Sequence, residues 1–448
     1  GVKNISSQST GGESYAGGFV GHIDKGVFEN INLKLNSDII SKGSDNSDYS
    51  DSYAGGFAGY VSNGTFSNIK LDGIKNISSQ TTINDKEHQS KNGSYAGGFA
   101  GLVYNGTFDN IKFNINGNLS SQATINYHQN SNRYSSYAGG FIGYIGNGTF
   151  DNIKFNINGN LSSQATINGE IDYTNSNPIG SFTGGFVGYG SENNNFKNIT
   201  FDIGNISSHA IINVKNGEYR YKAGSSYAGG FAGYVGGGTF SNIHLKNIGD
   251  ISNKVTKNNK EGNVESHVGG FAGYVYNGTF SNIILDGVKS ISSTIDGTGL
   301  DIGEYQDGIY VGGFIGSTDS YYNKRLSFSN IHLKSIGDIS STINGGDGRK
   351  IYMGGFIGNA YNVGKIDNIT IDGIKSITNT NNTENSSAAS ISAIGGFIGL
   401  LNSSAAIENI SIKNLGAISN LNKLLVHNNK IIAIIPNYTS GFIGEIGK

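Results

Sequence analysis

The stretch YAGGFAGYVSNGTFSNIKLDGIKNISSQTTI, residues 53–83, recurs in altered form along the whole chain. Its opening GGFxG is found ten times, and a weaker SGFIG begins at Ser440. The ten copies begin at Gly17, Gly55, Gly97, Gly139, Gly184, Gly229, Gly269, Gly312, Gly354 and Gly395. Their period, near 42 residues, is typical of stacked units that bury their apolar faces only against their neighbours. We therefore expect one repeat domain over residues 1–448.

Each copy contains strand-like segments separated by turn residues. In the quoted copy we expect strands over residues 55–61, 66–71 and 74–83, with a tight turn at Asn63-Gly64 and a break at Asp72-Gly73. The apolar residues have the even spacing of strands, and no stretch has the spacing of a helix. Three strands and three corners per copy predict an all-β parallel β-helix, or solenoid, of about eleven coils. At about 4.8 Å per coil, the rod would be on the order of 50 Å long.

Between the third strand of one copy and the next Gly-Gly, the sequence varies in length and composition. Because such segments leave each coil at the same point, we expect variable inserts displayed along one side of the rod. The inserts are residues 43–52, 84–94, 126–136, 168–182, 213–226, 253–266, 295–309, 344–351, 378–392 and 420–437.

Two positions hardly change among the copies, and we predict a structural role for both. The first is the Asn of an Asn-Ile pair, whose side chains would hydrogen-bond amide to amide between coils. These residues are Asn30, Asn68, Asn110, Asn152, Asn198, Asn242, Asn282, Asn330, Asn368 and Asn409. The second position lies two residues before this Asn. We expect its side chains to form an inward stack, which the Phe of GGFxG joins. Its members are Phe28, Phe66, Phe108, Phe150, Phe196, Phe240, Phe280 and Phe328, then Ile366 and Ile407.

The GGFxG segment is apolar on both of its faces. Alternation places Phe57 and Ala58 on opposite faces, yet the Ala58 position is apolar in the other copies as well. A strand that is apolar on both faces is buried on both. Either the Gly-Gly pair bends the chain and resets the alternation, or the outer face is covered. We expect the inserts to cover it, and lateral association with another chain is the open alternative.

Tyrosine supplies the candidate binding residues. One row lies two residues before Gly-Gly and consists of Tyr15, Tyr53, Tyr95, Tyr137, Tyr227, Tyr310, Tyr352 and Tyr438. A second row follows the motif and consists of Tyr60, Tyr144, Tyr189, Tyr234 and Tyr274. If the second row points outward, its rigid amphipathic rings suit contact with a sugar or a protein. The alternative is that these rings pack beneath the inserts.

No set of residues with the spacing of a catalytic or metal site recurs. Acidic residues are scattered, and Asp72, Asp286 and Asp372 precede turn glycines, where turn chemistry alone favours Asp. The eight histidines fall at unrelated positions, so no metal site and no Ser-His-Asp set is predicted. We expect no catalytic residue and no cofactor. Asn-Gly-Thr at Asn63, Asn105, Asn147 and Asn277 matches the glycosylation acceptor pattern, but its fixed place predicts a turn.

Composition excludes several other classes of protein. The net charge is −2 and no long block of like charge occurs, which argues against a nucleic-acid binder. The chain has no Cys, and therefore no disulfide and no thiolate metal site. It has no apolar run long enough for a transmembrane helix, and we expect no leader of the secretory kind in these residues. Residues 1–8 match residues 73–80, so we expect a fragment of a longer protein.

The GGFxG…NGTFxNI core resembles the GLUG-type repeat of large bacterial surface proteins and adhesins, whose pattern is close to GG[LF][VIA]G followed by a turn and [TS][IF]xN. Units rich in Ile and Asn, with long inserts, also resemble passenger regions of autotransporter adhesins. These include the vacuolating-toxin-like group of the Helicobacter and Campylobacter lineage. The resemblance implies export to the cell surface, a β-helical stalk and adhesion, and it brings no catalytic residues.

Residues 105–126 and 147–168 are identical, which indicates that a whole coil was duplicated. Such a change is tolerated where coils are interchangeable. We therefore expect a non-enzymatic bacterial adhesin, secreted or at the cell surface, that binds host cells, matrix or other bacteria. The expected partner is a host cell-surface glycan or protein, or another copy of the chain. The alternatives are a subunit of an extracellular filament, sheath or surface layer and, less favoured, a β-helical polysaccharide-degrading enzyme, which needs clustered carboxylates.

Overall fold

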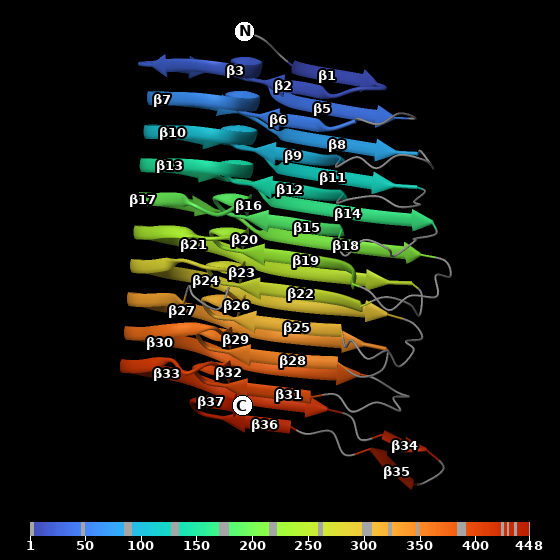
Figure 1. Ribbon diagram of the computed structural model, residues 1–448, viewed down its shortest axis with the longest axis vertical. Coiled ribbons are helices and arrows are strands. Elements are labelled where there is room, and N and C mark those ends of the chain that lie inside the picture. The colour runs from blue at the N-terminus through green and yellow to red at the C-terminus, as the bar shows by residue number, and fades with distance from the viewer. Residues whose placement is uncertain are drawn as a thin grey trace.

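The computed structural model describes residues 4–45, 50–84, 92–126, 134–169, 179–214, 222–258, 263–297, 307–320, 325–345, 349–382, 391–422, 425–427, 430–433 and 437–447. These ranges contain strands and turns and no helix, and so no helix that meets the length and hydropathy needed to cross a membrane. Figure 1 shows the coils stacked along one axis, with the N-terminus at one end and the C-terminus at the other. The predicted all-β parallel β-helix is confirmed.

Every coil has a short strand that ends at the first residue of the Gly-Gly pair or its equivalent. Together these strands form one eleven-stranded parallel sheet, called the front sheet here. Its strands are β2 (Ser14–Gly17), β6 (Ser52–Gly55), β9 (Asn92–Gly97), β12 (Tyr134–Gly139), β15 (Ile179–Gly184), β19 (Lys222–Gly229), β22 (Asn263–Gly269), β25 (Asp307–Gly312), β28 (Arg349–Gly354), β31 (Ile391–Gly395) and β36 (Asn437–Ser440).

The rest of each coil belongs to a single 24-stranded parallel sheet that wraps around the core. The strands that follow the bend at Gly-Gly-Phe are β3 (Val20–Glu29), β7 (Ala58–Ile74), β10 (Ala100–Ile115), β13 (Ile142–Ile157), β16 (Val187–Gly190), β20 (Ala232–Val235), β23 (Ala272–Val275), β26 (Ile315–Thr318), β29 (Ile357–Tyr361), β32 (Ile398–Asn402) and β37 (Ile443–Ile446). The strands that complete the coils are β1 (Asn4–Thr10), β4 (Asn32–Lys34), β5 (Asp38–Asp45), β8 (Ile77–Ile83), β11 (Leu119–Ile125), β14 (Leu161–Gly169), β17 (Asn194–Ile203), β18 (Ile206–Val214), β21 (Gly238–Lys257), β24 (Thr279–Gly297), β27 (Leu326–Asn344), β30 (Val363–Asn382) and β33 (Ala406–Asn422).

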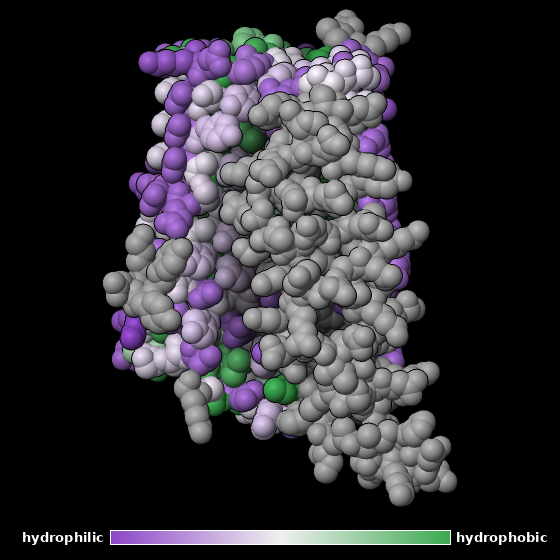
Figure 2. Space-filling view, turned by 45° about the vertical axis from the view of Figure 1, so that its right-hand side comes forward, coloured by the Kyte–Doolittle hydropathy of each residue, from purple (hydrophilic) through white to green (hydrophobic). Residues whose placement is uncertain are grey.

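One antiparallel pair, β34 (Leu425–His427) with β35 (Lys430–Ala433), lies outside these two sheets. About half of the residues in the predicted inserts lie outside the described residues. The described ends of the inserts belong largely to strands, as residues 253–257 of β21 and 263–266 of β22 do, so the predicted bounds were too wide. Figure 2 shows that the coloured part of one face of the rod is mostly hydrophilic, with scattered hydrophobic residues.

Two columns of Phe rings fill the core. In the column that contains Phe66, Phe108 and Phe150, neighbouring ring centroids from Phe28 to Phe328 lie 4.5 to 5.3 Å apart. The Phe of each GGFxG forms the second column, in which Phe57 and Phe99 are 5.0 Å apart. The two columns meet edge to face, as Phe57 and Phe66 do. This is a preferred geometry for aromatic pairs, so the inward stack also holds the two columns together.

The Gly-Gly pair is a sharp bend and not the beginning of a strand. Residue 55 ends β6 and Ala58 begins β7, and Phe57 and Ala58 are both fully buried. A Cβ atom on Gly55 would lie 1.9 Å from the carbonyl oxygen of Ala58, and one on Gly56 would lie 2.1 Å from that of Gly98. The bend therefore requires glycine at both positions. It also resets the alternation, which explains the two apolar faces; our expectation of a continuous strand covered by the inserts was wrong.

The left-handed corner of each coil is the Asn of the Asn-Ile pair. These Asn residues have φ between 52° and 57°, a conformation that Asn tolerates better than other residues with a Cβ. Our prediction of a tight turn at Asn63-Gly64 was wrong, because both residues lie within β7 and neither has a positive φ. The expected break at Asp72-Gly73 does bend the chain, since Gly73 has a φ of 80°.

The corner Asn side chains form hydrogen bonds from coil to coil. The Asn330 amide donates to Asn282 Oδ1 at 3.1 Å and its own Oδ1 accepts from Asn368 at 2.6 Å. At three coils the acceptor is instead the Asp that precedes the corner Asn of the neighbouring coil. These bonds are Asn152 to Asp109, Asn198 to Asp151 and Asn409 to Asp367.

A buried column of hydroxyl groups joins the front sheet to the strands behind it. The Ser79 hydroxyl on β8 donates to the Ser52 carbonyl at 2.7 Å, and the Ser94 hydroxyl donates to Ser79 Oγ at 2.9 Å. The same alternation continues through Ser121 and Ser136 in the next coil. Serine is thus buried between the layers without loss of its hydrogen bonds, as buried polar groups require.

Replacement of Asn330 tests the corner. Asn330→Ala removes both side-chain hydrogen bonds and places alanine, which cannot replace them, at a φ of 53°. Asn330→Gly removes the same hydrogen bonds, but glycine tolerates this φ. We expect urea unfolding to show that the Ala variant is the less stable by roughly 1 kcal/mol. Equal stability of the two variants would show that the left-handed angle does not select the residue.

Candidate functional site

The two tyrosine rows lie side by side and form one aromatic strip. The strip is defined by the front-sheet row from Tyr15 to Tyr352 and by the second row from Tyr60 to Tyr274. Strand register fills the gaps in the first row with Phe182 and His267, and places Ala393 after Tyr352. In the second row, Leu102 separates Tyr60 from Tyr144.

The second row is neither fully outward nor fully covered. Tyr144, Tyr189, Tyr234 and Tyr274 are half-buried and stack in parallel, with centroids 4.6 to 5.2 Å apart. One edge of each ring meets the front-sheet row, for example at 5.4 Å between Phe182 and Tyr189. The rings are therefore held rigidly on one side and remain partly accessible on the other.

Some front-sheet tyrosines have an acidic partner two residues earlier in the sequence, just before the strand begins. The Tyr15 hydroxyl donates to Glu13, and the Tyr53 hydroxyl donates to Asp51 Oδ2 at 2.6 Å. Asp51 also accepts a hydrogen bond from the Gly93 backbone N–H. Desolvation raises the pKa of Asp51 to about 7, against the lowering effect of these two hydrogen bonds.

This raised pKa predicts a pH-dependent stability. Between about pH 4 and pH 7 the folded chain keeps a proton on Asp51 that the unfolded chain releases, so this group makes stability fall as the pH rises through that window. Asp51→Asn keeps an acceptor for Tyr53 and cannot ionise. We expect thermal melts to show a higher Tm for the variant at pH 8 and little change at pH 4. An identical pH dependence in both proteins would contradict the assignment.

The second row ends in a hollow. Register places Ser317 after Tyr274, and Asn359 after Ser317, so two successive coils lack the ring of the preceding ones. The space beside them has a volume of about 490 Å³ and is called the Tyr274 pocket here. Its lining residues are Tyr227, Tyr234, Glu265, His267, Tyr274, Tyr310, Ser317, Thr318, Asp319, Asn359 and Tyr361.

His267 connects the floor of the Tyr274 pocket to its polar groups. Its ring stacks between Tyr227 and Tyr310, at 4.8 and 4.5 Å. Nδ1 lies 2.7 Å from Ser317 Oγ, and Nε2 lies 3.1 Å from Glu265 Oε2. The sequence expectation that no histidine forms a set with serine and an acid missed this triplet. Comparison of the Tyr rows coil by coil would have found it, because His267 and Ser317 both stand where most coils have an aromatic residue.

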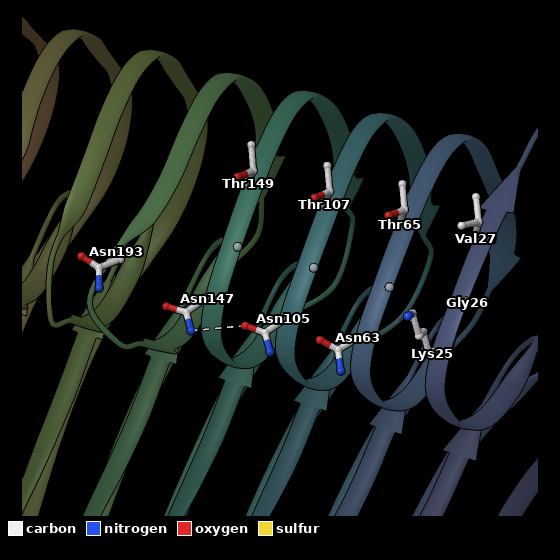
Figure 3. A pocket seen from close by; sticks show the side chains of 13 residues that line it. Lys25, Gly26, Val27, Asn63, Thr65, Asn105, Thr107, Asn147, Thr149 and Asn193 are labelled. Atoms are coloured by element: carbon white, nitrogen blue, oxygen red, sulfur yellow. Dashed lines mark hydrogen bonds between the residues drawn. The ribbon is translucent and has the colours of Figure 1, made fainter.

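A second hollow runs along the edge where β3, β7, β10 and β13 bend. It has a volume of about 610 Å³ and is lined by Lys25, Gly26, Val27 and Asn193 and by Asn-Gly-Thr at residues 63–65, 105–107 and 147–149. Figure 3 shows the Asn side chains in one row and the Thr side chains in another, with glycine between them. A hydrogen bond from the Asn147 side-chain amide to Asn105 Oδ1, at 3.3 Å, links two members of the Asn row. The described residues of this groove offer amide and hydroxyl groups and include no aromatic side chain.

Among the described residues, no group of three or more His, Asp or Glu side chains is arranged to hold a metal ion. The Asn column lies at a corner and the Phe columns lie in the core, and none of their members lines either hollow. The candidate site of the chain is therefore the aromatic strip together with the Tyr274 pocket.

Comparison of the chain with protein-family models, with curated proteins and with solved structures finds no significant match.

Proposed function

We propose that the chain is a non-enzymatic bacterial adhesin, at the cell surface or secreted, whose β-helix carries the aromatic strip as its contact surface. The observation that carries the proposal is the rigid, partly exposed stack of Tyr144, Tyr189, Tyr234 and Tyr274. Tyr rings that are already ordered lose little entropy on binding, and each offers both an apolar face and a hydroxyl group. Such rings suit a glycan or a protein of a host cell, of the matrix or of another bacterium.

The resemblance to GLUG-type repeats and to autotransporter passenger regions points in the same direction, and so does the duplicated coil at residues 105–126 and 147–168. A filament or surface-layer subunit was suggested by the two apolar faces of GGFxG. Because Phe57 and Ala58 are buried within the chain, that observation no longer favours lateral assembly.

Binding of the purified chain to cells tests the proposal. Beads coated with it should bind epithelial cells, matrix or bacteria more than uncoated beads do. We expect Tyr144→Ser with Tyr189→Ser to lower that binding several-fold, since both changes remove apolar ring surface. The matched control is Lys154→Ala with Lys197→Ala, two exposed residues in the same coils and outside the strip, which should leave binding unchanged.

No binding to any of the three targets would overturn the adhesin. An equal loss of binding in the Tyr pair and in the Lys pair would show that the aromatic strip is not the contact surface. Thermal melts of each variant exclude misfolding as the cause.

A further inference from the structure

We propose that the Tyr274 pocket binds one neutral sugar unit, a hexose or an N-acetylhexosamine, at the end of a glycan. The proposal rests on the proposed function, because it names the ligand class that the adhesin would recognise. The volume of the Tyr274 pocket, about 490 Å³, lies within the range of roughly 300–1,000 Å³ that is usual for small-molecule sites.

The first argument is the ring of Tyr274. One of its faces stacks on Tyr234 at 5.0 Å. On the other side the next residue of the row is Ser317, so no ring of the described residues stacks on that face. The row thus ends in an aromatic face that borders the hollow. The C–H face of a pyranose fits such a surface, because it is flat and apolar.

The second argument is the supply of hydrogen-bond acceptors. Asn359 Oδ1 is buried beside the pocket and accepts no hydrogen bond from the described residues, which is costly unless water or a ligand supplies a donor. Asp319 accepts from the Ser320 N–H at 2.7 Å through one oxygen, Oδ1. Acceptors beside an apolar ring match the edge of a sugar, where hydroxyl groups surround the C–H face.

The third argument is charge. Among the described residues that line the pocket, Glu265 and Asp319 are acidic and none is Lys or Arg. A sialic acid or a uronic acid would bring a carboxylate next to these groups without a cation to pair with it, which is unfavourable. A simple ammonium ion would leave the apolar face of Tyr274 largely unused. The lining therefore favours a neutral sugar.

The rim of the pocket is fixed in place by hydrogen bonds. Thr318 Oγ1 donates to the Tyr361 carbonyl at 2.9 Å and accepts from the Tyr361 N–H at 2.9 Å. Tyr361, one of the exposed aromatic residues, is thereby held beside the opening. A preformed pocket spends little binding energy on ordering its own groups.

The test is saturation-transfer NMR and titration calorimetry on the purified full chain. The probes are the methyl glycosides of glucose, galactose, mannose, N-acetylglucosamine and N-acetylgalactosamine, with sialyllactose and choline as comparators. We expect at least one neutral glycoside to bind saturably. Tyr274→Ala should weaken its binding about tenfold or more, because the stacking face is lost, and Asn359→Ala should weaken it several-fold.

Two further variants control the result. Ser317→Tyr restores the ring that other coils have and fills the hollow, so it should abolish binding in a protein that still melts cooperatively. Lys289→Ala changes an exposed side chain in the coil of Tyr274, paired with Asp250 at 2.7 Å, and should leave binding unchanged.

Several outcomes overturn the proposal: binding of choline or sialyllactose alone, binding of none of the probes, or neutral-sugar binding that survives Ser317→Tyr. Hydrolysis of the corresponding nitrophenyl glycosides that depends on Glu265 would make the pocket catalytic and overturn its assignment as a binding site. If no sugar binds but the coated beads still adhere, the sugar-binding proposal fails and the adhesin proposal stands. If a sugar binds but the beads do not adhere, the adhesin proposal fails and the sugar-binding proposal stands.

Discussion

Strand hydrogen bonding holds neighbouring coils about 4.8 Å apart, and every inward side chain must accept its counterpart at that spacing. Flat rings satisfy this condition in parallel stacks, as the 5.0 Å separation of Phe57 and Phe99 shows. Amides satisfy it through side-chain hydrogen bonds at the corner, and hydroxyl groups satisfy it between the layers. A small residue in a row of rings leaves a gap, and the Tyr274 pocket arises in this way, where Ser317 and Asn359 continue the row of Tyr274.

The same spacing explains why the recurring segment contains so many glycines. The chain bends sharply at Gly55-Gly56 and packs closely against the next coil, so a Cβ atom there would meet backbone oxygens. Gly59 lets the strand after the bend lie directly on the front sheet, since a Cβ on it would lie 3.0 Å from the Tyr53 carbonyl oxygen. The bend thus brings the second Tyr row against the first, so the fold and the aromatic strip depend on the same three glycines.

Much of the fold could be predicted from the sequence because repetition averages out local ambiguity. The period, the three-strand coil and the paired Phe and Asn positions follow from what recurs. The strand boundaries could not be predicted from the recurring pattern. Asn63-Gly64 has the composition of a turn but lies within β7, because strand pairing with neighbouring coils overrides local preference.

The candidate site was harder to predict, since it depends on what does not recur. The second Tyr row was visible in the sequence, but the pocket is formed where Ser317 and Asn359 replace it. His267, Ser317 and Glu265 come from two coils, and only the stacking register brings them together. A search for departures from the repeat, in place of the repeat itself, is the signal that sequence reasoning lacked.

The central claim, that the register of identical coils determines the fold, is tested most directly by excision of a coil. Removal of residues 105–146 joins Tyr104 to Asn147 and restores the native sequence at the junction, because residues 105–126 and 147–168 are identical. Removal of residues 106–146 leaves one residue more and shifts the strand by one position, which turns its side chains to the opposite face. Thermal melts followed by circular dichroism should show a near-native Tm for the first protein and a clearly lower one for the second. Equal melting temperatures, or failure of the first protein to fold, would contradict the account.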